Sequence, residues 1–213
     1  MSRGKWKFDD KVASQFDAIA RTNIPNYESV LEKCVMIAKA TFPDTEHARI
    51  IDVGSATGNT LQKFREAGYA QVFGVDSSKA MLARSRVKEN LIHSETFPKK
   101  YGPFDLVLAN WTLHFIKERE AYLHDIYDSL TEKGILVLSE RMKSSDIVYK
   151  QYHTFKRSMG LSEQEIREKE AAIEGVLVPY PIEWYFETLK EIGFKKVEVI
   201  DAAWCFNTML SRA

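Results

Sequence analysis

The sequence predicts an α/β fold with a doubly wound, mostly parallel sheet. Short apolar runs alternate with stretches of helical periodicity along most of the chain, which is typical of βαβ units. The first apolar run ends in an acidic residue and a glycine-rich segment, I-I-D-V-G-S-A-T-G-N-T over residues 50–60, as expected where a parallel strand meets a ligand-binding loop. The length of 213 residues favours one domain over residues 1–213.

The composition is that of a globular protein without net charge. Hydrophobic residues make up 45% of the chain and charged residues 28%, which excludes a disordered chain or a coiled-coil rod. Thirty Lys and Arg side chains balance thirty Asp and Glu side chains, so no global positive field attracts nucleic acid or anionic lipid. We therefore expect no direct nucleic-acid partner and no membrane partner.

The two cysteines indicate a reducing compartment. Cys34 and Cys205 lie far apart and form no C-x-x-C motif of the kind that serves zinc or redox chemistry. No stretch approaches the roughly 20 apolar residues of a membrane span, and residues 1–10 hold no apolar signal-peptide core. The sequence thus predicts a cytoplasmic protein without a bound metal.

The first 45 residues are expected to form a helical lead-in before the sheet. Over residues 9–21 the apolar positions fall at spacings of four, three and one, which predicts one face of a helix capped by Asp9 or Asp10. A second helical pattern follows Pro25, continues to about residue 40 and ends before Pro43.

Seven short segments are expected to be the strands of a mixed sheet. Their predicted bounds are 49–53, 70–75, 91–96, 104–109, 134–139, 195–200 and 207–211. The helices predicted between them cover residues 61–68, 78–87, 119–130 and 182–192. The third strand is the least apolar, since only Leu91 and Ile92 are strongly apolar there, and the last two strands are expected to pair antiparallel at the sheet edge.

Residues 145–175 interrupt the alternation of strands and helices. Two helical patterns, over 145–159 and 162–173, follow one another there without a strand between them. Because ligands bind at the carboxyl ends of the strands in doubly wound sheets, we expect this insertion to cover the pocket as a lid.

The glycine-rich segment has the chemistry of a ligand-binding loop. Its pattern, Asp52-x-Gly54-x-x-x-Gly58, puts glycines where the backbone must turn tightly and a ligand must approach the main chain. It is not the G-x-G-x-x-G of dinucleotide-binding proteins, because Ala56 holds the middle position and Asn59 the last. The alternative interpretation is a plain turn between a strand and a helix.

Asp76 stands at the end of the second predicted strand, in V-F-G-V-D-S over residues 72–77. A carboxylate at this position can accept hydrogen bonds from both hydroxyls of a ribose, and NAD-binding folds place an acidic residue similarly. The alternative role for Asp76 is an ordinary cap of the helix that follows.

These residues resemble motif I of the class I S-adenosylmethionine-dependent methyltransferases, which have a Rossmann-like fold. A closer resemblance, to the carboxy-S-adenosylmethionine synthase family, extends over nearly the whole chain. It rests on W-x-F-D at 6–9, I-P-N-Y at 24–27, L-A-N-W-T-L-H-F at 108–115, L-S-E at 138–140 and F-K-R-S-M-G-L-S-E at 155–163. The last block is the most specific because it belongs to the insertion rather than to the generic sheet.

The resemblance implies an activity and a set of binding residues. Members of that family form homodimers and convert S-adenosylmethionine and prephenate into a carboxymethyl sulfonium that serves the modification of the tRNA wobble uridine, but do not themselves modify tRNA. The cofactor-binding residues implied are Tyr27, Asp52, Gly54, Ser55, Ala56, Gly58, Asp76, Ser77, Glu95, Thr96 and Asn110. The implied cofactor is S-adenosylmethionine or its carboxylated form.

One position departs from the family pattern. The family has an arginine in the insertion that pairs with the extra carboxylate of the carboxylated cofactor, and counting from the 155–163 block places Glu170 there. A glutamate repels a carboxylate. Arg167 lies one helical turn earlier and is the alternative residue for that role.

No catalytic residue is assigned from the sequence, because a sulfonium methyl group is already an activated electrophile. We interpret His114, between Leu113 and Phe115, as a packing residue. Three functions are compatible with the sequence: a diverged methyltransferase that uses ordinary S-adenosylmethionine on a small-molecule acceptor, a carboxy-S-adenosylmethionine synthase, and a non-catalytic protein that binds S-adenosylmethionine.

Overall fold

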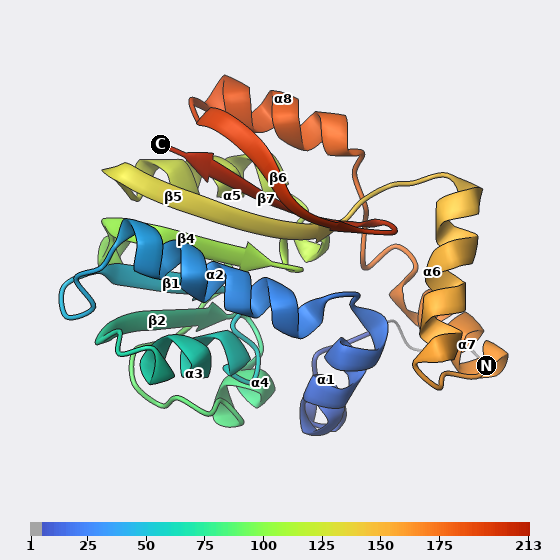
Figure 1. Cartoon of the computed structure of the whole chain (residues 1–213). Helices are drawn as coiled ribbons and strands as arrows, with labels where there is room; N and C mark the ends of the chain where they lie inside the picture. The colour runs from blue at the N-terminus through green and yellow to red at the C-terminus, as the bar shows by residue number, and fades with distance from the viewer. Residues whose placement is uncertain (1–5) are drawn as a thin grey trace.

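A computed structural model describes residues 6–213, which form a seven-stranded sheet in the order β3-β2-β1-β4-β5-β7-β6 with helices on both faces (Figure 1). The first five residues of the predicted lead-in lie outside the described residues. The strands are β1 Arg49–Val53, β2 Gln71–Asp76, β3 Leu91–His93, β4 Phe104–Asn110, β5 Leu130–Arg141, β6 Lys195–Ala203 and β7 Phe206–Arg212. The predicted α/β class and the seven strands are confirmed.

The sheet is mixed, as predicted. Strands β1 to β5 pair parallel with their neighbours, whereas β7 runs antiparallel between β5 and β6. The weakly apolar third strand exists but is only three residues long, with Leu91 opposite Gly74 of β2. Because β1, β2, β4 and β5 are parallel, their carboxyl ends meet at one edge of the sheet.

The helices follow the predicted order. Their bounds are α1 Asp10–Asn23, α2 Tyr27–Thr41, α3 Asn59–Glu66, α4 Lys79–Ala83, α5 Arg119–Asp128, α6 Asp146–Ser158, α7 Glu163–Ile173 and α8 Ile182–Ile192, with 3-10 helices η1 Lys99–Tyr101 and η2 Leu113–Phe115. Asp9 is the cap of α1, since its Oδ1 accepts a hydrogen bond from the Val12 N–H at 3.0 Å. Helix α7 begins with a capping box made by Ser162 and Glu165.

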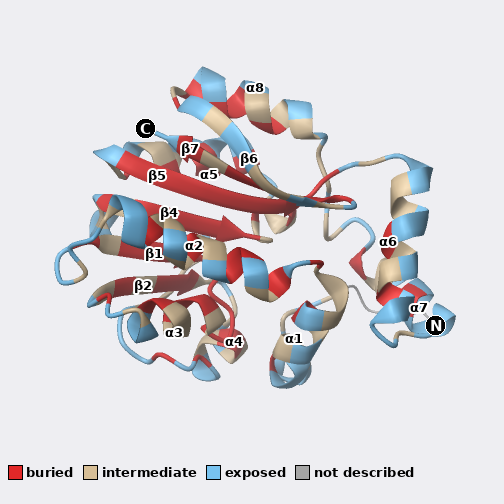
Figure 2. Ribbon diagram, viewed as in Figure 1, coloured by how far each residue is buried: buried red, intermediate tan, exposed pale blue. Residues whose placement is uncertain are grey.

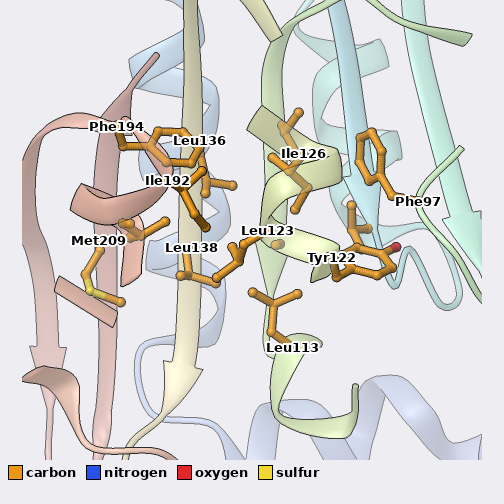
Figure 3. Packing of buried hydrophobic residues seen from close by; sticks show 14 of the residues in the cluster. Phe97, Leu113, Tyr122, Leu123, Ile126, Leu136, Leu138, Ile192, Phe194 and Met209 are labelled. Carbon is orange, nitrogen blue, oxygen red and sulfur yellow. The ribbon is translucent and has the colours of Figure 1, made fainter. Parts of the chain in front are cut away.

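Two hydrophobic cores cover the two faces of the sheet. Along β4, Leu106 and Leu108 pack with residues of α2 and α3, whereas Val107 and Ala109 pack with residues of α5 and α8. Figure 3 shows the second core, where Leu123 and Ile126 of α5 meet side chains of β5 and α8. Figure 2 shows the result, a central sheet that is buried almost throughout β4 and β5.

The predicted helix over 78–87 is shorter than expected, because α4 ends at Ala83. Residues beyond it make contacts that a helix would not allow: the Arg86 N–H donates to the Thr57 carbonyl at 3.0 Å, and Ser85 Oγ donates to the Val87 carbonyl at 2.7 Å. Tertiary contacts with the loop after β1 therefore override the helical periodicity.

The helix predicted over 119–130 ends at Asp128, and the strand predicted over 134–139 is longer than expected. Leu130 already pairs with Phe104, and a register shift follows before Leu106 pairs with Ile135. The apolar run from Ile135 covers only the buried part of this strand, so the exposed beginning of β5 carried no apolar signal.

The predicted insertion consists of α6 and α7. Figure 1 shows both helices standing beyond the carboxyl ends of the parallel strands, with α1 beside them. Helix α6 is tied to the lead-in, since the Tyr152 hydroxyl donates to the Asn23 carbonyl at 2.7 Å. The lead-in and the insertion together face the sheet edge where a doubly wound fold binds its ligand.

Candidate active site

A cavity of about 710 Å³ opens at the carboxyl ends of β1, β2, β4 and β5. The loops after these strands form its floor, and residues of α1, α6 and α7 form the opposite wall. All the predicted cofactor-binding residues except Gly58 line it: Tyr27, Asp52, Gly54, Ser55, Ala56, Asp76, Ser77, Glu95, Thr96 and Asn110. The fold therefore brings together residues that are up to 83 positions apart (Asn110 minus Tyr27).

The loop after β1 brings its main chain to the cavity wall. Gly54 has a φ of 70°, and a Cβ there would overlap the Thr112 side chain, so both the conformation and the space require glycine. The Ser55 Oγ is buried and has no hydrogen-bond partner within residues 6–213. A ligand that satisfies this hydroxyl would remove the cost of an unpaired buried polar group.

Gly58 stands apart from the other predicted cofactor-binding residues. It does not line the cavity; its φ of 78° forms the N-cap of α3, and a side chain there would collide with Ser85. This glycine closes the loop against the segment after α4, so its contribution to the site is conformational.

Asp76 ties the ends of β1 and β2 together. Its Oδ2 accepts from the Ala56 N–H at 2.9 Å and its Oδ1 from the Ser78 N–H at 2.7 Å. Each carboxylate oxygen has two lone pairs, so both oxygens keep acceptor capacity for hydroxyl groups of a ligand. The cap of α4 is Ser78 rather than Asp76, because Ser78 Oγ accepts from the Met81 N–H at 3.2 Å.

Asp52 is a second carboxylate in the cavity wall. Burial raises its pKa to about 7, and the nearby charge of Asp76 adds to the increase, although a hydrogen bond from Thr60 opposes it. A positively charged ligand placed beside Asp52 would favour the ionised carboxylate. This end of the cavity therefore suits a cation.

Two aromatic rings and an amide complete the cavity floor. Tyr27 stacks on Trp111 with ring centroids 5.0 Å apart, and its hydroxyl oxygen accepts from Asn59 Nδ2 at 3.0 Å. Trp111 follows β4 with a φ of 57°, a conformation that a bulky residue rarely adopts. Asn110 is held by a hydrogen bond of 2.7 Å from Ser139 Oγ to its Oδ1.

Charged side chains gather at the other end of the cavity. Arg141 and Lys156 both line it and are buried, Lys156 to 1% side-chain exposure. Glu170 does not line the cavity itself but binds both cations: its Oε2 lies 3.0 Å from Arg141 Nη2, and its Oε1 lies 2.6 Å from Lys156 Nζ. Although burial raises the pKa of Glu170, the charges of Arg141 and Lys156 outweigh it and hold that pKa below its ordinary value.

Lys169 and Arg167 both lie on α7 shortly before Glu170 but differ in placement. Lys169 lines the cavity with its Nζ 2.9 Å from the ring centroid of Trp6, and burial lowers its pKa to about 7 with the help of Lys156. Arg167 is exposed and does not line the cavity. The alternative role predicted for Arg167 therefore has no support from its position.

The sequence interpretation missed a histidine–glutamate pair in the cavity wall. His114 lines the cavity, and its Nδ1 lies 2.6 Å from Oε2 of the fully buried Glu140, off the line of an ideal N–H···O bond. Glu140 is 26 residues away on another strand, so no local spacing could have indicated the pair. The only available signal was a histidine four residues after Asn110, where β4 ends at the site.

Within residues 6–213, no cluster of three or more His, Cys, Asp or Glu side chains could hold a metal ion. None of the helices there is long and apolar enough to cross a membrane.

Comparison with known families agrees with the site geometry. Residues 29–199 match the family described as "Methyltransferase domain". The carboxy-S-adenosyl-L-methionine synthase of Nautilia profundicola is 34% identical over 211 residues, covering 92% of this chain and 89% of that protein. The enzyme of the same name from Helicobacter hepaticus is 33% identical, covering 98% of this chain and 95% of that protein.

A solved structure shows the same fold. The crystal structure of a putative S-adenosyl-L-methionine-dependent methyltransferase from Methanococcus maripaludis superimposes with a TM-score of 0.65 at 19% identity. The match covers 99% of this chain and 96% of the other.

Proposed function

The chain belongs to the carboxy-S-adenosyl-L-methionine synthase family of methyltransferase-fold enzymes, and from this premise we propose that it is a diverged member that uses ordinary S-adenosylmethionine. In this proposal the enzyme transfers the sulfonium methyl group to a small acceptor. The observation that carries it is the position of Glu170. Its carboxylate forms ion pairs with the two buried cations, Arg141 and Lys156, at the end of the cavity near α6 and α7.

The residues of the cavity suit S-adenosylmethionine. The unpaired Ser55 hydroxyl and the spare acceptor capacity of Asp76 match a ligand with polar groups and a ribose. The raised pKa of Asp52 matches a ligand that carries a positive charge. Asn110, Glu95 and Thr96 are assigned to the same ligand because they line the continuous cavity beyond the loop.

Glu170 opposes a carboxylated cofactor for an electrostatic reason. A ligand carboxylate at this end would have to displace the Glu170 carboxylate from Arg141 and Lys156, or lie beside it as a like charge. The uncarboxylated cofactor needs neither change.

The chemistry divides between cofactor and protein. S-adenosylmethionine, when bound, supplies an activated methyl group on a sulfonium centre. The chain orients the two reactants: the loop after β1 and Asp76 fix one of them, and the walls from α1, α6 and α7 exclude water around the other. We propose that α6 and α7 act as the lid predicted from the sequence.

A second candidate function is the family activity itself. Arg141 and Lys156 carry two positive charges against the single negative charge of Glu170, so the cluster keeps a net positive charge that could attract a carboxylate. This observation favours a carboxy-S-adenosylmethionine synthase in which Glu170 moves aside.

Mass spectrometry of the small molecule that copurifies with the protein tests these alternatives. S-adenosylmethionine or its homocysteine product is the expected result. Carboxy-S-adenosylmethionine would support the second candidate and contradict the first. A preparation without any such molecule that also fails to bind S-adenosylmethionine in calorimetry would contradict both.

We also propose a cytoplasmic homodimer, on the basis of the family relationship. Light scattering coupled to size-exclusion chromatography should give twice the mass of the 24.5 kDa chain. A monomer at micromolar concentration would contradict the dimer but would leave the assignment of the cofactor unaffected.

A further inference from the structure

The buried pair of His114 and Glu140 is not among the residues assigned to the cofactor, and His114 lines the same cavity. Glu140 is held rigidly, because its two carboxylate oxygens accept from the backbone N–H groups of Thr112, Leu113 and His114 at 3.1, 2.8 and 2.9 Å. The carboxylate that faces the imidazole is thus fixed by the turn after β4, next to Asn110. A histidine positioned by a buried carboxylate is the usual form of a general base.

The free nitrogen of the imidazole is directed toward the cavity. Nδ1 and Nε2 are separated by one ring carbon and point in divergent directions, and Nδ1 faces Glu140 at 2.6 Å. Nε2 makes no hydrogen bond with any residue of 6–213, and His114 lines the cavity although the residue is only 3% exposed. The contact between Nδ1 and Glu140 is short, but its angle departs from that of a good hydrogen bond. Catalytic hydrogen bonds are commonly misaligned in this way before substrate binds.

Arg119 and Glu140 belong to one hydrogen-bond network next to the pair. Arg119 is buried and donates to the Leu113 carbonyl at 2.8 Å and to the Tyr185 hydroxyl at 2.9 Å, and that hydroxyl also contacts Glu140. The network therefore includes one positive charge, on α5, and one negative charge, on β5. Lys117 and Glu118 line the cavity nearby.

The side chains around His114 favour an aromatic substrate. Phe115 packs against the His114 ring with centroids 4.5 Å apart, and Phe8 contacts Phe115 edge-on at 5.1 Å. Trp111 and Tyr152 extend the aromatic lining toward α6. Aromatic walls of this kind bind a planar ring by stacking and edge contacts.

We propose that His114, positioned by Glu140, is the general base for methyl transfer to a phenolic hydroxyl. His114 Nε2 takes the hydroxyl proton as the phenol oxygen forms a bond to the sulfonium methyl carbon. The carbon–sulfur bond breaks with its electron pair on sulfur, leaving an aryl methyl ether, S-adenosylhomocysteine and an imidazolium beside Glu140. The inference rests on the proposed function, since it needs S-adenosylmethionine as methyl donor.

Two phenols separate base catalysis from simple positioning. 4-Methylphenol keeps its proton near neutral pH, like the tyrosine side chain with its pKa of about 10, whereas 4-nitrophenol is already ionised at about pH 9. For His114→Gln we expect a loss of kcat of at least about 100-fold with 4-methylphenol, and less than about threefold with 4-nitrophenol at about pH 9. The exposed His124 of α5 supplies the control His124→Gln, which should match wild type with both phenols.

Glu140 is a positioning residue, and its test is a pH profile. Without the carboxylate the imidazolium loses its partner, so Glu140→Gln should move the acidic limb of the profile of kcat/KM for 4-methylphenol to lower pH. An unchanged limb would show that Glu140 only supports the fold. Thermal unfolding of both variants checks that they are folded.

A spectroscopic measurement gives a readout that does not depend on turnover. With S-adenosylhomocysteine bound, the visible absorption of 4-nitrophenol reports whether its hydroxyl is ionised. We expect wild type to ionise the bound phenol at a lower pH than His114→Gln does. Equal titration in the two proteins would overturn the role of His114.

The remaining outcomes are also decisive. If the protein binds S-adenosylmethionine in calorimetry but methylates and binds neither phenol, the inference is wrong and the proposed function stands. If it binds no S-adenosylmethionine, the proposed function itself is wrong. A similar loss with both phenols in His114→Gln would assign His114 to packing.

Discussion

The two ends of the cavity are built by different means. At the end formed by β1 and β2, the main chain of the loop around Gly54 and the carboxylate of Asp76 make the site. At the end formed by β5, α6 and α7, the buried cations Arg141 and Lys156 line the cavity, and Glu170, which lies 29 and 14 residues further along the chain, pairs with both. The first end depends on local backbone geometry and the second on long-range side-chain pairing.

Because of this difference, substitutions at the two ends should affect different properties of the protein. Asp76 accepts from two backbone N–H groups and keeps acceptor capacity for a ligand, whereas Glu170 holds two buried cations of the fold. Changes at the first end should therefore weaken ligand binding, and changes at the second end should reduce the free energy of unfolding.

The largest effect is expected for Glu170→Ala. Removing the carboxylate leaves Arg141 and the fully buried Lys156 without their partner, which should reduce the free energy of unfolding by about 3 kcal/mol. Urea unfolding measures this change. The exposed Glu168 of the same helix provides the control Glu168→Ala, and equal midpoints for the two variants would show that Glu170 is not a structural partner.

Asp76→Ala should show the opposite pattern. If Asp76 accepts from two ribose hydroxyls as proposed, the substitution removes these acceptors, and S-adenosylmethionine affinity should fall by about 1.5 to 3 kcal/mol, or ten- to a hundredfold. Calorimetry measures the loss, with Glu89→Ala on the exposed loop before β3 as the control. Unchanged affinity for Asp76→Ala would remove Asp76 from the binding site.

The binding of S-adenosylmethionine should depend on pH through Asp52. Burial raises the pKa of Asp52 to about 7, so the carboxyl is largely protonated at pH 6 and ionised at pH 8. A cationic ligand favours the ionised form, and affinity should rise by up to about tenfold between these pH values. Asp52→Asn should lose this dependence; a variant with the wild-type slope would assign it to another group, such as Lys169.

The smallest effect is expected for Arg167→Ala. Arg167 is exposed on α7 and does not line the cavity, so the free energy of unfolding should stay within about 0.5 kcal/mol of wild type. Cofactor affinity should also be unchanged. A clear loss of cofactor binding would show that Arg167 contributes to specificity, and it would contradict the proposed difference between the two ends.

Much of the fold could be predicted from the sequence, because buried strands are continuous apolar runs. Errors arose where tertiary contacts decided the local structure: α4 ends early because Arg86 bonds to the loop after β1, and β5 begins before its apolar run. Hydrophobic periodicity indicates which residues are buried. It therefore gives no sign of a backbone hydrogen bond to a distant carbonyl or of an exposed strand end.

The site could be predicted in part for the same reason. Asp52, Gly54 and Asp76 lie at or next to strand ends, and parallel strands bring those ends together. The partners of Glu170 and of His114 lie on other elements and became visible only in the fold. Gly58 was predicted from its spacing, and a spacing alone does not tell which side of a loop a glycine faces; its conformation forms the start of α3.

Competition between S-adenosylmethionine and carboxy-S-adenosylmethionine tests the central claim most directly. Calorimetry on wild type should show tighter binding of the uncarboxylated cofactor, because Arg141 and Lys156 are already paired with the carboxylate of Glu170. Glu170→Arg should shift the ratio of the two affinities toward the carboxylated cofactor by about 1.5 to 3 kcal/mol, or ten- to a hundredfold, whereas Glu168→Arg should leave it unchanged. Tighter binding of carboxy-S-adenosylmethionine by wild type, or an unchanged ratio in Glu170→Arg, would contradict the proposed divergence.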